Sequence, residues 1–94
     1  MDFTSIHNYY EHLVINYIRT DVIPDLEHQP TDFFLDIACY ALTRLPTRYT
    51  RHEIDMAFYL DSDERNKMMK EVEDAVTDAV IYITENFNKN QRYE

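Results

Sequence analysis

Apolar residues recur every three or four positions along two segments in the first half of the chain, the spacing that amphipathic helices show. The first segment predicts a helix from Ser5 to about Thr20, capped by Thr4 or Ser5, and Pro24 is expected to end it soon afterwards. The second predicts a helix from Asp32 to Leu45, ended by Pro46, with an apolar surface wide enough for a central helix. The apolar positions of the two segments are Ile6, Tyr9, Tyr10, Leu13, Val14, Tyr17 and Ile18, and then Phe33, Phe34, Ile37, Ala38, Tyr40, Ala41, Leu42 and Leu45.

The second half of the chain predicts two more helices. Thr50 followed by Glu53 fits the capping box of a short helix before Leu60. The acidic run Asp61–Glu64 indicates a helix start, and a last long helix follows it to about Asn88. The apolar positions of this last helix are Met69, Val72, Val76, Ala79, Val80, Ile83 and Phe87. The sequence therefore predicts an all-α fold, a small bundle of about four helices, and its complete lack of glycine agrees because hairpin turns favour glycine.

Length and composition predict one globular domain across residues 1–94, with 45% hydrophobic and 29% charged residues. A chain of this length buries a modest core, which favours stabilisation by a second subunit. No apolar run is long enough to span a membrane and the start lacks the basic residues of a signal peptide, so the expected location is the cytoplasm. The single cysteine, Cys39, excludes an internal disulfide, and its apolar helical surroundings predict a buried, unreactive thiol.

Charged residues are unevenly distributed along the chain. The formal net charge of −9 argues against binding DNA or RNA, because Lys and Arg that neutralise phosphates supply most of that affinity. No acidic residue lies between Asp36 and Glu53, however. The basic residues of this window are Arg44, Arg48, Arg51 and His52. We therefore expect the window to bind a small anion, with Tyr40 and Tyr49 as flat surfaces on which a base can stack.

Motifs for catalysis and metal binding are weak. No Ser or Cys nucleophile has a placed base and no Gly-rich loop is present, so the chain is predicted not to be an enzyme. His7 and His12 are five positions apart, a poor spacing for metal ligands, and the run Asp61–Glu64 lacks the glycine of a calcium loop. Neither a metal nor a cofactor is expected. The acidic residues of the last helix are expected to form a solvated face, and they are Glu71, Glu73, Asp74 and Asp78.

Two segments of the chain carry a resemblance to a known family. Residues 8–14 fit the pattern N-x-x-E-x-[LF]-V. Residues 36–49 resemble D-[IV]-x-A-x-[AS]-L-N-x-L-P-P-[RK]-Y, the signature of the late competence protein ComFB family. Thr43 and Thr47 stand where that signature has Asn and Pro, and several family members carry a C-x-x-C pair that is absent here. The zinc associated with at least one member is therefore not carried over to this chain.

The resemblance implies a small helical homodimer that acts as a receptor for a cyclic dinucleotide, chiefly cyclic di-GMP, with cyclic di-AMP as the alternative. Such bacterial receptors relay the signal to a protein partner and influence motility, biofilm formation, competence or cell size. Arginine pairs with phosphate or with guanine, hydroxyl groups donate to phosphate, and carboxylates accept from guanine N–H groups. The predicted ligand-binding residues are Arg44, Arg48, Tyr49, Arg51, Thr43, Thr47, Asp36 and Glu11.

Structural roles are open alternatives for the same residues. Arg44 near a helix C-terminus complements the helix dipole, and Arg48 can pair with acidic residues in a structural network. Tyr49 can fill the core after the turn. The alternative function is accordingly a helical dimeric adaptor that binds an acidic protein partner and has no nucleotide ligand. A hydrolase that acts on a phosphoester is a further alternative, distinguished by turnover of the ligand.

Overall fold

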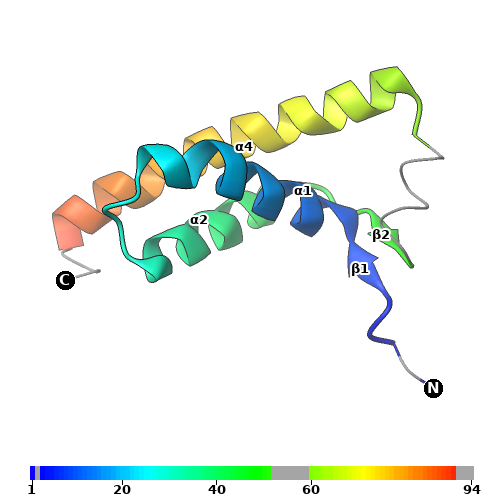
Figure 1. The fold of residues 1–94 in the computed structure, drawn as a ribbon, viewed down its shortest axis with the longest axis horizontal. Coiled ribbons are helices and arrows are strands. Elements are labelled where there is room, and N and C mark those ends of the chain that lie inside the picture. Colours follow the sequence, from blue (N-terminus) through cyan, green and yellow to red (C-terminus); the bar gives the residue numbers. More distant parts are fainter. Residues whose placement is uncertain (2, 52–59, 91–94) are drawn as a thin grey trace.

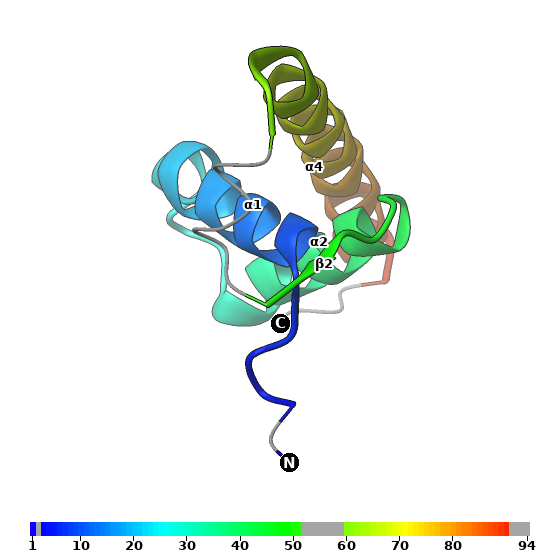
Figure 2. The same ribbon diagram turned by 90° about the vertical axis from the view of Figure 1, so that its right-hand side faces the viewer.

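The computed structural model describes residues 1, 3–51 and 60–90 of the chain. α1 (Tyr9–Tyr17) and α2 (Thr31–Thr43) lie side by side against α4 (Ser62–Asn90), which runs the length of the molecule (Figures 1 and 2). Two short strands, β1 (His7–Asn8) and β2 (Tyr49–Thr50), form an antiparallel pair beside the start of α1. The all-α prediction is confirmed apart from this pair, and the predicted capping-box helix falls on residues outside the described ranges.

α1 begins later than its hydrophobic pattern predicts. The prediction placed the start at Ser5, whereas the first helical residue is Tyr9 and Asn8 is the N-cap. The Asn8 side-chain oxygen accepts a hydrogen bond from the Tyr10 N–H at 3.2 Å, which satisfies one free donor of the first turn. Ile6 precedes the helix and is 49% exposed, so it is not part of the apolar stripe. The predicted start was wrong because residues 7 and 8 pair with β2, a segment distant in the sequence.

The first helical rod continues beyond its predicted end at Thr20. A π-helical segment, η1 (Ile18–Val22), and a 3-10 segment, η2 (Ile23–Asp25), follow α1 directly. Pro24 does not end the rod, because proline is tolerated in the first turn of a helical segment, where its missing N–H needs no acceptor. The extension carries Val22 into the core, where it is buried.

α2 contacts both α1 and α4, as a central helix does, but one side of it remains open. Phe33 is fully buried, whereas Leu35 is 57% exposed. Cys39, one turn after Leu35, is also exposed. The prediction of a buried thiol was therefore wrong, because this row of positions points away from both neighbouring helices. The helix ends at Thr43, two positions before the predicted Leu45.

α4 is the longest helix, and it begins where the acidic run predicts. The Asp61 side chain accepts a hydrogen bond from the Glu64 N–H at 2.8 Å, as an N-cap residue does. The helix continues to Asn90, two residues past the predicted Asn88. At its start Met68 is buried and Met69 is exposed, so the predicted apolar stripe was displaced by one position there.

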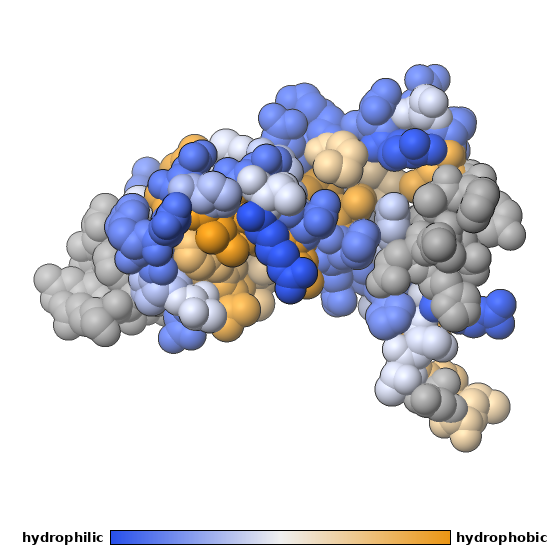
Figure 3. Space-filling view, in the orientation of Figure 1, coloured by the Kyte–Doolittle hydropathy of each residue, from blue (hydrophilic) through white to orange (hydrophobic). Residues whose placement is uncertain are grey.

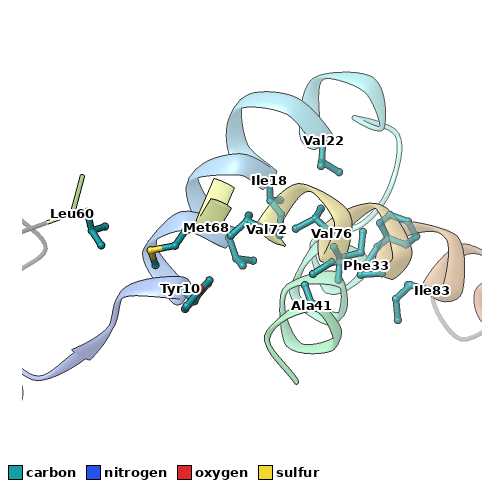
Figure 4. Packing of buried hydrophobic residues seen from close by; sticks show 14 residues of the cluster. Tyr10, Ile18, Val22, Phe33, Ala41, Leu60, Met68, Val72, Val76 and Ile83 are labelled. Carbon is teal, nitrogen blue, oxygen red and sulfur yellow. The ribbon is translucent and has the colours of Figure 1, made fainter. Parts of the chain in front are cut away.

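The core lies between these three helices and consists of apolar side chains (Figure 4). Its largest fully buried members are Phe33, Ile37, Val14, Val72 and Val76. Fully burying one such side chain contributes about 1.5–3 kcal/mol, so this packing fixes the rotation of α4 against α2. That rotation decides which polar side chains of α4 meet the end of α2. Within the described ranges, no helix has the length and apolar character needed to cross a membrane.

Candidate ligand-binding site

Arg44, at the C-terminal end of α2, forms a surface stack with two tyrosines. Its guanidinium Nη1 donates a hydrogen bond to the Tyr40 hydroxyl at 2.9 Å, and its Cζ lies 5.4 Å from the centre of the Tyr40 ring. The contact arises because residues four positions apart share one face of a helix. The Tyr40 ring stacks on Tyr82 of α4, with 4.5 Å between ring centroids and 17° between ring planes. A cation and two rings thus form one surface on which a further planar group can stack.

Arg48 is positioned through its backbone. Its N–H donates to the Asn8 side-chain oxygen at 2.9 Å, and its carbonyl accepts from the Tyr9 N–H at 2.7 Å. The pairing of β1 with β2 follows at once, with Asn8 opposite Tyr49. These bonds hold the turn after Pro46 against the start of α1, while the Arg48 side chain is exposed.

Arg44 and Arg48 line adjoining pockets that share one glutamate of α4. Arg48 lines a pocket of about 260 Å³ with Tyr10 and Glu71. Arg44 lines a pocket of about 250 Å³ with Glu71 and Asp78. The basic window of the sequence therefore faces carboxylates from a distant part of the chain. The prediction that the acidic residues of α4 form only a solvated face was incomplete, because three of them, Glu71, Asp74 and Asp78, line these pockets.

Tyr10 connects the Arg48 pocket to the core. The residue is buried, and its hydroxyl donates a hydrogen bond to Glu71 Oε2 at 3.5 Å. Burial raises the pKa of Tyr10 above its ordinary value, the negative charge of Glu71 raises it further, and the positive charge of Arg48 opposes the shift. Tyr10 is therefore neutral at physiological pH and keeps a proton directed at the carboxylate between the two pockets.

Thr43 and Thr47 differ in what their hydroxyl groups can offer a ligand. The Thr43 hydroxyl donates to the Tyr40 carbonyl at 2.7 Å, so its proton is engaged within α2. Thr47 is exposed in the turn before Arg48. Of the two predicted phosphate donors, Thr47 is therefore the better placed.

Tyr49 and Arg51 extend the exposed surface along β2. Tyr49 is a residue of the strand and is exposed, so the alternative in which it fills the core is wrong. Arg51 follows the strand directly and is exposed as well. Neither residue lines the pockets of Arg44 and Arg48, and both can contact only a ligand that extends beyond those pockets.

The two predicted acidic site residues lie at different places. Asp36 is on α2, two turns before Arg44 and on the same helix face as Tyr40. Glu11 lines a separate pocket of about 330 Å³ with His7 of β1 and other residues along the α1–η1 rod, so the structure does not bring it into the pockets of the two arginines. In the part of the chain that the structure describes, no group of three or more His, Cys, Asp or Glu could hold a metal ion.

Three residues that build this site were not predicted to do so. Asn8 belongs to the first motif, and its preference for the N-cap position was a usable signal for the helix start. Tyr82 is an aromatic residue outside the apolar stripe of α4, which also was a usable signal. Glu71 carried no local signal, because its place between the arginines depends on how α4 packs against α2.

The family model for late competence development protein ComFB matches residues 7–87. The chain belongs to the ComFB family. The matched range contains the whole candidate site of this ComFB-family chain, from Asn8 to Tyr82, and begins at β1. Residues 1–6 precede the match. No curated protein and no solved structure matched the chain.

Proposed function

We propose that this ComFB-family chain is a non-enzymatic receptor that binds a cyclic dinucleotide, chiefly cyclic di-GMP, and relays the signal to a protein partner. The observation that carries the proposal is the stack of Arg44, Tyr40 and Tyr82 at the surface, adjoining the Arg48 pocket. A purine can extend such a stack, and each guanidinium can pair bidentately with a phosphate or with the O6/N7 edge of guanine.

The carboxylates beside the arginines favour a particular kind of anion. Glu71 and Asp78 would repel a ligand that offered phosphates alone. Guanine, in contrast, presents N–H groups on the edge opposite its acceptors, and a carboxylate can accept from them. Adenine lacks the donor at N1. The mixed charge of the pockets therefore supports cyclic di-GMP over cyclic di-AMP.

A dimer fits this ligand. Cyclic di-GMP is twofold symmetric, so the twofold axis of a homodimer would present one set of Arg44 and Arg48 to each half of the ligand. The expected stoichiometry is then one ligand for two chains, or two ligands that stack across the axis. We include the homodimer in the proposed function on this ground and on the family membership.

Isothermal titration calorimetry with cyclic di-GMP tests the proposal, with cyclic di-AMP and GMP titrated in parallel. We expect saturable binding of cyclic di-GMP and silence with GMP. Arg44→Ala and Arg48→Ala should each weaken binding by roughly 5- to 150-fold, the equivalent of about 1–3 kcal/mol for one bidentate pair. Arg65→Ala is the matched control, since it makes the same charge change at an exposed position of α4 outside both pockets.

Two results would contradict the receptor assignment. Silence of the unmodified protein towards both cyclic dinucleotides would favour the adaptor that binds an acidic protein partner. Loss of affinity in Arg65→Ala equal to that in Arg44→Ala would mean that overall charge, and not this site, governs binding. Chromatography of the ligand after incubation tests the absence of catalysis, for which we expect the nucleotide to be recovered unchanged.

A further inference from the structure

Residues 3–6 form an arm that leaves the helical body ahead of β1 (Figures 1 and 2). The arm contains a turn in which the Ile6 N–H donates to the Phe3 carbonyl at 3.1 Å. Such a turn brings its first and fourth residues within about 7 Å of each other. Phe3 is 65% exposed and Ile6 is 49% exposed, so the arm presents a compact apolar knob to water. Covering such exposed apolar side chains with another apolar surface lowers the free energy, because it removes them from water.

The same chain has an apolar groove with room for such a knob. The groove runs between the α1–η1 rod and α2 and has a volume of about 460 Å³. Its apolar lining consists of Ile15, Ile18, Ile23, Phe34, Leu35 and Ala38. Figure 3 shows apolar surface exposed between these elements, and apolar atoms at the tip of the arm, apart from the body. Among the described residues that line the groove, Arg19 is the only charged one.

We propose that the arm of one copy of this chain docks in the groove of a second copy, with the Phe3–Ile6 knob against Leu35 and its neighbours. The arm does not reach the groove of its own chain in the observed arrangement. The pairing of β1 with β2 and the bond from the Tyr9 N–H to the Arg48 carbonyl hold β1 and the start of α1 in place, and residues 3–6 point away from the helical body ahead of them. A second copy can receive the arm in this direction, whereas docking in the groove of its own chain would require the arm to reverse its direction ahead of β1.

Charge distinguishes this groove from the other apolar pocket of the molecule. That pocket, of about 200 Å³ between the rod and α4, carries Asp21 and Asp25 in its lining. An apolar side chain docked in the smaller pocket would take water from these two carboxylates, whereas Arg19 is the one charged residue in the described lining of the larger groove, and its long side chain can keep its charged end in water.

Reciprocal docking across a twofold axis uses both arms and closes the assembly at two copies. A buried phenylalanine removes about 150–250 Å² of surface from water, so two knobs and their grooves approach roughly 1,000 Å², at the lower end of specific interfaces. The expected dimer is therefore in rapid exchange with monomer. Residues 1–6 precede the family match. The inference rests on the homodimer of the proposed function and deepens it by assigning an interface to that dimer.

Sedimentation velocity of the full chain without nucleotide, over a concentration series, tests the proposal. Phe3→Asp and Leu35→Asp should each raise the dissociation constant of the dimer by at least about tenfold. Ile81→Asp is the matched control, because Ile81 is 54% exposed against 57% for Leu35 and lines the smaller pocket instead. It should leave the dissociation constant unchanged. All three positions are exposed, and far-UV circular dichroism verifies that each variant is folded.

Mixing the two variants separates arm docking from a self-complementary face. Phe3→Asp keeps an intact groove and Leu35→Asp keeps an intact arm, so their mixture should form a heterodimer with one docked arm while neither variant dimerises alone. A groove that packs on itself predicts no recovery. That result would overturn the proposal, as would a wild-type chain that stays monomeric or a dimer that survives Phe3→Asp. Calorimetry with cyclic di-GMP on the unmodified chain keeps such a failure distinct from a failure of the receptor assignment, because that chain can bind the nucleotide whichever surface forms the dimer.

Discussion

Replacing Asn8 with alanine removes one acceptor that serves two backbone donors. The Asn8 side-chain oxygen lies 3.2 Å from the Tyr10 nitrogen and 2.9 Å from the Arg48 nitrogen. The first bond caps α1, and the second holds the turn that carries Arg48. We expect Asn8→Ala to destabilise the fold and to loosen this turn while the apolar core stays intact.

The magnitude follows from the two bonds. Loss of an N-cap side chain costs about 0.5–2 kcal/mol, and loss of a further neutral hydrogen bond costs about 0.5–1.5 kcal/mol. The turn at Arg48 is exposed, so water replaces part of the second bond. The free energy of unfolding should therefore fall by about 2 kcal/mol, which lowers Tm by roughly 8–16 °C for a domain of this size.

Urea denaturation followed by circular dichroism measures this change, with two controls. Asn8→Asp keeps an acceptor at the same place and adds a negative charge at the helix N-terminus, so it should stay within about 0.5 kcal/mol of the wild type or exceed it. Asn66→Ala, at an exposed position of α4, should change stability by less than about 0.5 kcal/mol. The reasoning is refuted if Asn8→Ala unfolds like Asn66→Ala, or if the aspartate variant is as unstable as the alanine variant.

Two further predictions concern Tyr10 and Phe33. Burial, and then the charge of Glu71, raise the pKa of Tyr10 above 10.0. The contribution of Tyr10 to stability is therefore fully present below pH 10 and is lost as the pH rises through the higher folded-state pKa. Thermal melts over this pH range should show the fall in stability, and an equal fall in Tyr10→Phe would contradict the assignment to Tyr10. Phe33 is fully buried, so Phe33→Ala should cost about 3–5 kcal/mol by urea denaturation; a cost no larger than that of Leu35→Ala, at a position 57% exposed, would count against the described core.

The long helices could be predicted because their signals are local. α4 has an acidic cap at Asp61 and an apolar row with helical period, and both lie within a few residues of the positions they determine. The start of α1 could not be placed in the same way. Ile6 fits the apolar row of the helix, yet residues 7 and 8 pair with residues 49 and 50, and a pairing partner more than forty positions away leaves no periodic signal. The start of α1 is therefore determined by tertiary contacts and not by the local sequence.

The residues of the candidate site also differ in whether their role depends on local sequence or on tertiary packing. Arg44, Arg48 and Tyr40 could be predicted because they lie in one short window without acidic residues. Tyr82 carried a signal as an aromatic residue outside the apolar row of α4, and Glu71 carried none. Which residues of α2 these two side chains meet depends on the rotation of α4 against α2, which the buried apolar packing sets. The exposure of Cys39 has the same origin, because residue type alone does not tell which row of an apolar helix lacks a neighbour.

Asn8 also lies between the two proposed interactions of the chain. It is a residue of β1, which continues directly from the arm, and it binds the backbone of Arg48. A ligand that shifts the Arg48 backbone must therefore shift β1 and the direction of the arm. Linkage requires reciprocity: the factor by which ligand strengthens the dimer equals the factor by which the dimer strengthens ligand binding. If the ligand contacts the Arg48 side chain and leaves the Arg48 backbone in place, the coupling factor is one, and ligand binding does not affect dimer formation. Asn8→Ala removes one of the links between β1 and the Arg48 backbone and leaves the Tyr9 N–H bond and the β1–β2 pairing in place, so it should lower this factor towards one without abolishing either binding event.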